Sequence, residues 1–266
     1  MKIHLLSYGA KGNRHDYSQY FPTLKKQAVQ TSWFDSIITM NKKDLPQEYV
    51  SKFHHILDER GAGYWTWKPW IITDKINSLP NDDILIYCDA QTTINGKATS
   101  RFYEYIDMLN SSDLGCISFQ FTSRVETPDK LWKEKQFTYE QTFDYFNISS
   151  DSEHRNTGQI VANCIILRVN EHAKFICNKW KDTLIQRLSL FTDEYIEDNK
   201  NQNTYFCDNR HDQSIFSVIR KKYDSIMLSD ETLFPDGLGD NSFYTDGTNT
   251  NYPFWKYAPP EGWVFE

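Results

Sequence analysis

The sequence predicts a single α/β domain with a mixed, mainly parallel sheet flanked by helices. Over roughly residues 1–90, short apolar runs alternate with segments of helical periodicity, as expected when helices connect and cover parallel strands. The run Ile84–Cys88 is continuous, apolar and bounded by Asp residues, which is typical of a central strand. No internal repeat or interdomain linker is visible in the 266 residues, so one domain is the simplest organisation.

Strands are expected where a short apolar run ends in a turn-forming or polar residue. The first, Lys2–Tyr8, ends at Gly9, and the second is Ser36–Met40. Ile84–Cys88 is the third and central one. The remaining expected strands lie at residues 116–121, 159–169 and 226–228.

Helices are expected where apolar residues recur every three or four positions, at residues 21–31, 46–60, 68–79, 101–109, 171–191 and 211–223. Pro22 falls in the first turn of the first helix, where a missing N–H does no harm. Gly61 should stop the second helix. Residues 127–157 should form an excursion with one or two helices, and the aromatic-rich tail from Ser229 an ordered, irregular segment.

Composition excludes some classes of protein. The net charge of −7 argues against a duplex nucleic-acid partner, which requires a basic face. The five Cys are scattered and form no CxxC, so neither a disulfide framework nor a thiolate metal site is indicated. The N-terminus resembles a strand rather than a signal peptide, and no apolar run approaches the ~20 residues of a membrane span. We expect a cytoplasmic protein, with peripheral membrane association left open.

The strongest local feature is the triplet Asp89-Ala90-Gln91 directly after the central strand. Ligands of open α/β sheets gather beyond the carboxyl ends of strands. A carboxylate there can bind Mg²⁺ or Mn²⁺ and bridge it to a diphosphate. The alternative is a surface Asp that merely ends a strand, and taken alone the two interpretations weigh about equally.

A second feature is the run GAGYWTWKPW at residues 61–70, which leads into a helix. Tyr64, Trp65 and Trp67 offer stacking surfaces, and Lys68 near the helix start could meet a phosphate. The alternative, a helix-ending Gly followed by core tryptophans, holds for part of this run.

Two further segments could carry chemistry. Asp212 opens the helix at residues 211–223 and could act as a general base, although an Asp in a first turn also suits the helix dipole. Small residues from Gly158 to Ala162 would let a ligand lie against the backbone, and Asn163 can hydrogen-bond a hydroxyl. The alternative for this second segment is an ordinary strand beginning.

Together and in this order, these segments resemble the GT-A glycosyltransferases. Asp89-Ala90-Gln91 stands where that family has its DXD motif, residues 158–163 resemble its donor-sugar loop, and Arg210-His211-Asp212 its acidic motif at a helix start. The combination GYWTWKPW, YCDA and RHDQS is similar to a chlorovirus glycosyltransferase domain and to small glycosyltransferases of bacterial polysaccharide clusters. The resemblance covers roughly residues 1–228.

The resemblance implies a GT-A-like fold and transfer of a sugar from a UDP- or dTDP-sugar to a glycan hydroxyl. Residues 1–95 would bind the nucleotide, residues 96–228 the donor sugar and acceptor, and residues 229–266 form the tail. Asp212 would be the base of an inverting reaction, and Asp89 would bind Mn²⁺ or Mg²⁺. The implied donor site comprises Trp65, Lys68, Asp89, Ala90, Gln91, Gly158, Ala162, Asn163 and His211.

The sequence departs from the family at the metal site. Gln91 replaces the second acid of the DXD motif, and an amide binds hard cations less well than a carboxylate. The family's C-terminal metal-binding His has no match, because His211 is the last histidine. Candidate substitutes in the tail are Asp236, Asp240 and Asp246.

Two other functions stay open. A sugar-phosphate nucleotidyltransferase would need a glycine-rich, basic loop after the first strand, for which residues 9–14 (GAKGNR) are a loose candidate. A non-catalytic carbohydrate-binding domain would use some of the 8 Trp, 16 Tyr and 17 Phe, although a ring-rich core accounts for most of them. Hydrolase motifs such as GxSxG and HExxH do not occur.

Overall fold

The computed structural model describes residues 1–11, 15–121, 132–198, 201–232 and 252–256. Its centre is a six-stranded sheet with the order β2-β1-β3-β6-β5-β7. Only β6 runs antiparallel to its neighbours, so the sheet is mixed and mainly parallel, as predicted. The strands are β1 (Ile3–Tyr8), β2 (Ser36–Met40), β3 (Ile84–Cys88), β5 (Cys116–Gln120), β6 (Cys164–Arg168) and β7 (Ile226–Ser229).

The middle of the sheet is buried on both faces. Every residue of β1 and β3 is buried, which explains why both strands are mostly apolar rather than alternating; β1 also buries the polar residues His4 and Ser7. The register aligns Leu5 of β1 with Ile86 of β3, and Ile86 with Ile166 of β6. The prediction that Ile84–Cys88 forms a central strand is therefore confirmed.

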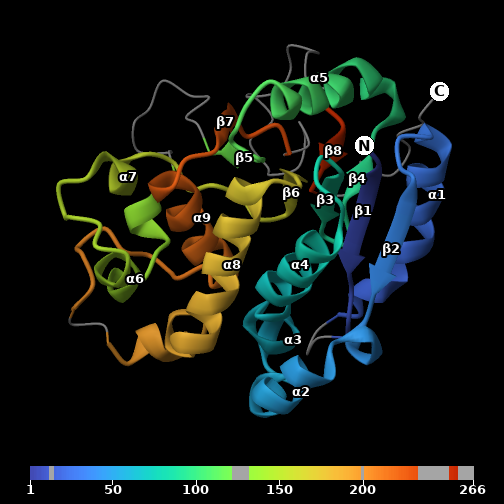
Figure 1. The fold of residues 1–266 in the computed structure, drawn as a ribbon. Coiled ribbons are helices and arrows are strands. Elements are labelled where there is room, and N and C mark those ends of the chain that lie inside the picture. The colour runs from blue at the N-terminus through green and yellow to red at the C-terminus, as the bar shows by residue number, and fades with distance from the viewer. Residues whose placement is uncertain (12–14, 122–131, 199–200, 233–251, 257–266) are drawn as a thin grey trace, which may run out of the picture.

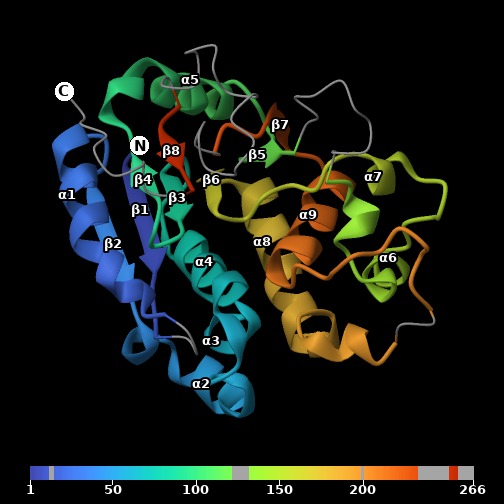
Figure 2. The same ribbon diagram turned by 180° about the vertical axis from the view of Figure 1, so that it is seen from behind.

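Helices cover the two faces of this sheet with separate cores. On one face, α1 (Phe21–Thr31) and α5 (Thr99–Asn110) pack through buried residues such as Leu24 and Phe102. On the other face lie α4 (Trp67–Ser78), α8 (Glu171–Gln186) and α9 (Asp212–Lys222). Helices α4 and α8 lie side by side (Figure 1, and from behind in Figure 2). Trp180 of α8 stacks on Phe216 of α9 with ring centroids 3.9 Å apart.

Shorter elements complete the described chain: α2 (Gln47–Phe53), α6 (Glu140–Tyr145) and α7 (Glu153–Asn156), of which the last two fall in the predicted excursion. A second, two-stranded sheet pairs β4 (Thr93–Ile94) with β8 (Phe254–Trp255). Most of the predicted irregular tail lies outside the described residues, but β8 shows that part of it returns to the segment after the central strand. In the described part of the chain, no helix is long and apolar enough to cross a membrane.

The segment after α2 differs most from the prediction of a helix over residues 46–60. The α-helix ends at Phe53. Residues 61–65, most of the element labelled α3 (Arg60–Tyr64), all have positive φ values between 54° and 99°, so this is a left-handed turn. Gly61 and Gly63 make it accessible, because left-handed backbone costs glycine little. The turn carries Trp65 toward the sheet edge described below.

Two other predicted boundaries change. Of the strand expected over residues 159–169, only Cys164–Arg168 pairs regularly; Ile160 forms an isolated bridge to Gln120 instead. The helix expected to reach residue 191 ends at Gln186. The division of the chain at residues 95 and 228 stays a prediction.

Candidate active site

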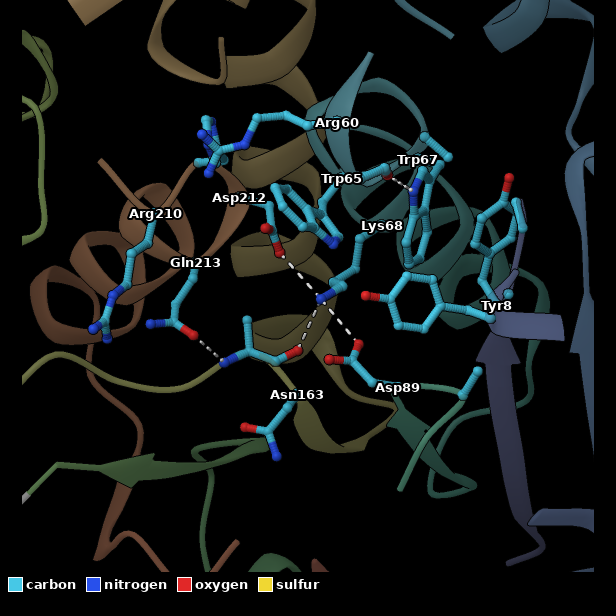
Figure 3. A pocket seen from close by; sticks show the side chains of 18 of the residues that line it. Tyr8, Arg60, Trp65, Trp67, Lys68, Asp89, Asn163, Arg210, Asp212 and Gln213 are labelled. Atoms are coloured by element: carbon cyan, nitrogen blue, oxygen red, sulfur yellow. Dashed lines mark hydrogen bonds and ion pairs between the residues drawn. The ribbon is translucent and has the colours of Figure 1, made fainter. Parts of the chain in front are cut away.

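A cleft opens at the carboxyl ends of parallel strands β1 and β3 (Figure 3). Tyr8, Gly9 and Ala10 line it from the end of β1, and Asp89 from the end of β3. Because β6 is antiparallel, its beginning lies at the same edge, and Ala162 just before it also lines the cleft. This is the place where open α/β sheets bind ligands.

The cleft brings together nine of the residues predicted as site residues: Trp65, Lys68, Asp89, Ala90, Gln91, Ala162, Asn163, His211 and Asp212. Gly158 is not among the lining residues. A side chain at Gly158 would collide with the Phe121 carbonyl, and the Gly158 carbonyl accepts a hydrogen bond from Gln120 Nε2 at 2.9 Å. The reason for a glycine there is therefore close packing against the chain after β5.

Lys68 lies at the centre of the cleft. Its side chain is 4% exposed, and its Nζ donates a hydrogen bond to the Ala162 carbonyl at 3.1 Å. The same nitrogen lies 3.2 Å from Asp89 Oδ1 and 3.3 Å from Asp212 Oδ2 (dashed lines in Figure 3). The Tyr87 ring passes 5.2 Å from it. Residues from the start of α4, the end of β3 and the start of α9 thus meet at one cation.

Burial and charge set the protonation of this group of residues. Burial raises the pKa of Asp212 to about 6, while Lys68 opposes the rise and Asp89 adds to it. Burial by itself would lower the pKa of Lys68, but the carboxylates of Asp212 and Asp89 outweigh it and raise that pKa. Near neutral pH, Lys68 is therefore an ammonium ion and Asp212 mainly a carboxylate.

Several residues that line the cleft carry a buried polar atom with no hydrogen-bond partner among the described residues: Tyr8 Oη, His211 Nε2, Asp212 Oδ2 and Asn163 Nδ2. The last two belong to residues predicted to act as the base and to bind the sugar. Both side chains belong to residues that are only 4% exposed. Asp212 Oδ2 has only the ion-pair contact with Lys68. A buried polar atom without a partner costs free energy, so the cleft offers an acceptor and a donor that a polar ligand would satisfy.

His211 holds the start of α9 in place. Its backbone has a positive φ of 52°, which is unusual for a residue other than glycine. Its Nδ1 donates to the Phe191 carbonyl at 2.8 Å, and its ring stacks on Trp65 with centroids 5.4 Å apart. His211 is 1% exposed. This packing indicates that His211 orients Asp212.

The three tryptophans of the GYWTWKPW run divide between cleft and core. Trp70 is buried in the main core, as the core interpretation of this run requires. Trp65 and Trp67 line the cleft. Trp67 stacks on Tyr8 at 4.0 Å, and its Nε1 donates to the Gly61 carbonyl at 3.0 Å. The left-handed turn therefore holds one wall of the cleft.

Trp67 and Arg210, which the sequence motifs included but the implied donor site did not, also line the cleft. The cleft residues without a predicted role in this site are Tyr8, Gly9, Ala10, Tyr17, Arg60, Gly61, Ala62, Asp208, Asn209, Gln213 and Lys256. Tyr8 ends β1, so the strand-end rule that selected Asp89 could also have found it. Gln213 was detectable by its place beside Asp212; its Oε1 accepts from the Ala162 N–H at 3.2 Å. Arg60 and Lys256 carry no sequence signal of this kind.

The lining of the cleft carries more positive than negative side chains, although the whole chain is acidic. Among the described residues that line it, the cations are Arg60, Lys68, Arg210 and Lys256, and the carboxylates are Asp89, Asp208 and Asp212. The whole chain carries a net charge of −7. A local excess of cations in an acidic protein suits an anionic ligand.

The described residues do not fit the divalent cation expected at Asp89. They contain no group of three His, Cys, Asp or Glu side chains that could hold a metal ion. Asp89 Oδ1 already accepts from the Tyr87 hydroxyl at 2.7 Å and lies beside the Lys68 ammonium, which would repel a second cation. Asp236, Asp240 and Asp246, the other candidate ligands, lie outside the described residues.

Comparisons with known proteins give low similarities. No protein-family model matches the sequence, and no curated protein does. Three solved structures are similar over most of the chain, at 11–12% identity. All three are glycosyltransferases. One is involved in glycosylation of the major capsid of PBCV-1, with 96% of this chain and 94% of that chain covered and a TM-score of 0.47.

The second is mouse xyloside xylosyltransferase 1, with 86% and 85% of the two chains covered and a TM-score of 0.42. The third is the galactosyltransferase LgtC with donor and acceptor sugar analogues, with 98% and 88% covered and a TM-score of 0.41. At these values the likeness says nothing about the reaction, which has to be inferred from the site itself.

Proposed function

We propose that this protein is a glycosyltransferase that moves a sugar from a UDP- or dTDP-sugar to a hydroxyl group of a glycan, with inversion at the anomeric carbon. The observation that carries the proposal is the pair of unsatisfied atoms, Asp212 Oδ2 and Asn163 Nδ2, in a cleft at the ends of β1 and β3. A sugar hydroxyl both donates and accepts hydrogen bonds, so it can satisfy either atom.

The two ends of the cleft suit the two parts of such a donor. Tyr8, Ala10 and Tyr17 give the β1 end apolar and aromatic surface, on which a nucleoside can lie. Asp212, Asn163 and Gln213 give the other end its polar side chains. The cationic side chains of the lining favour binding of a diphosphate between these two ends. The order of motifs along the sequence, which resembles the GT-A family, points the same way.

In the proposed reaction, Asp212 is the general base. Its carboxylate accepts the proton of the acceptor hydroxyl while that oxygen bonds to the anomeric carbon. The bond from the anomeric carbon to the diphosphate oxygen breaks, and its electron pair leaves with the diphosphate. The Lys68 ammonium favours the ionised form of this carboxylate. His211, whose ring is held by the Phe191 carbonyl, directly precedes Asp212 and fixes the start of its helix. We place this reaction in the cytoplasm.

The test is a panel of UDP-, dTDP- and GDP-sugars offered to the full chain. Binding is measured by calorimetry, and slow release of free sugar is measured without an acceptor. We expect one UDP- or dTDP-sugar to bind and to be hydrolysed slowly. Absence of binding by every nucleotide sugar would overturn the proposal, and NMR of the anomeric proton in the product decides between inversion and retention.

A further inference from the structure

Lys68 occupies the position in the cleft where a diphosphate-binding cation is expected. Its ammonium lies 3.2 Å from Asp89 Oδ1, the carboxylate that was expected to bind the metal. It reaches this position from the first turn of α4, and its contacts with Asp89, Asp212 and the Ala162 carbonyl hold the buried ammonium there. A cation of the chain itself thus stands beside Asp89, where the metal ion was expected.

All three N–H donors of the Lys68 ammonium have an oxygen of the protein within reach. One is engaged by the Ala162 carbonyl at 3.1 Å. The other two face Asp89 and Asp212 across ion-pair distances of 3.2 and 3.3 Å. A phosphate oxygen that enters beside Asp89 would take the place of one of these two carboxylate contacts.

A second lysine reaches the cleft from the C-terminal tail. Lys256 lines the cleft and directly follows β8. The pairing of Trp255 with Thr93 places this strand against the segment just after Asp89-Ala90-Gln91. The backbone N–H of Lys256 donates to the Thr232 carbonyl at 2.7 Å, which fixes its position further. The tail thus contributes a cation next to the motif that departs from the DXD pattern.

We propose that Lys68, with Lys256, performs at the donor diphosphate the charge neutralisation for which a divalent cation was expected, so that transfer proceeds without a metal ion. This inference rests on the proposed function. Asp89 then acts as a positioning residue, which holds the Lys68 ammonium against the leaving group. A carboxylate is then not required at position 91, where this chain has Gln, because no hard cation has to be bound.

The chemistry balances without a metal. The bond between the anomeric carbon and the diphosphate oxygen breaks, and its electron pair stays on that oxygen. Hydrogen bonds from the Lys68 ammonium stabilise the negative charge that develops there. The acceptor proton goes to Asp212, so the lysine needs to give up no proton of its own.

The experiment compares the full chain after exhaustive EDTA treatment with the same protein in Mn²⁺. Turnover of the donor found in the nucleotide-sugar panel is measured, together with the affinity for the corresponding nucleoside diphosphate by calorimetry. We expect both quantities to agree within about twofold between the two conditions. Turnover that is lost in EDTA and restored by Mn²⁺ would overturn the inference while leaving the glycosyltransferase proposal intact. If no nucleotide sugar turns over in either condition, both proposals fail.

Variants provide the second arm of the experiment. In EDTA, Lys68→Met should lower turnover by about 100-fold, and Lys256→Met should weaken diphosphate binding more than nucleoside binding. Lys25→Met, on the exposed side of α1, is the matched control and should behave as the parent protein. Because Lys68→Met leaves buried carboxylates unpaired, thermal unfolding is measured in parallel. If Lys68→Met does not fold, Lys256→Met still tests the proposal, because Lys256 is only half-buried. Unchanged diphosphate affinity in Lys256→Met would show that Lys256 does not bind the diphosphate.

Discussion

Lys68 at the start of α4 and Asp212 at the start of α9 form a buried ion pair of 3.3 Å. The two helices cover the same face of the sheet, and their first turns point at the edge where β1 and β3 end. Opposite charges from two helix starts therefore meet at one point of the cleft, and removal of either should alter both binding and chemistry.

Asp212→Asn should abolish most of the catalytic activity. An amide cannot accept the acceptor proton, so kcat for transfer should fall by about 100-fold or more, while the nucleoside diphosphate still binds. Asp182→Asn, on an exposed position of α8, serves as the control and should keep full activity. Unchanged transfer in Asp212→Asn would show that another group is the base.

The pH dependence follows from the raised pKa of Asp212. The base works only as a carboxylate, so kcat/KM should rise with pH through about 6. The Lys68 pKa is raised, so the ammonium stays charged across this range.

The contribution of Asp212 to the free energy of unfolding should change with pH in the opposite direction. The folded state binds the Asp212 proton more tightly than the unfolded chain does, so this contribution is present at acid pH and is lost as pH rises from 3.8 to about 6. A pH-rate profile and denaturant titrations check the two trends.

Asn163→Ala should impair recognition of the sugar but not of the nucleotide. The variant removes the unsatisfied Nδ2 donor, so KM for the sugar nucleotide should rise by about 10-fold or more. The affinity for the free nucleoside diphosphate should stay the same, because that ligand lacks the sugar. Equal losses for both ligands would place Asn163 at the phosphates instead.

Gly61→Ala should destabilise the protein by about 1–3 kcal/mol, because Gly61 has φ +66° and an added Cβ would collide with the Trp65 ring. Gly96→Ala is the matched control, since its Cβ would meet only Thr31 at an ordinary 3.5 Å. Urea unfolding of both variants gives the comparison. A Gly61→Ala protein as stable as Gly96→Ala would mean that neither the positive φ nor the Trp65 ring requires glycine at position 61.

Local pattern predicted most of the elements and the most prominent site residues. The apolar run Ile84–Cys88 identified the central strand, and the strand-end rule then selected Asp89. A helix start at residue 212 selected Asp212. These signals are short-range, because a continuous apolar run and a helical periodicity can both be recognised within a short window of sequence.

Other features depended on contacts between distant parts of the chain. The left-handed turn at residues 61–65 could not be read as such, because a run of Gly and aromatic residues is also compatible with an ordinary helix end. The antiparallel direction of β6 was also undetermined, since burial on both faces gives the same apolar pattern for either direction. That direction is what brings Asn163 to the cleft.

The sequence by itself determined the class of fold, the central strand and the two carboxylates at element ends, because hydrophobic periodicity and element boundaries are local properties. Only the tertiary structure decided that the Lys68 ammonium stands between those carboxylates and that Lys256, from the tail, lines the same cleft. Helix packing and strand pairing between distant segments determine which charged side chains come together, so a local sequence pattern cannot predict these contacts.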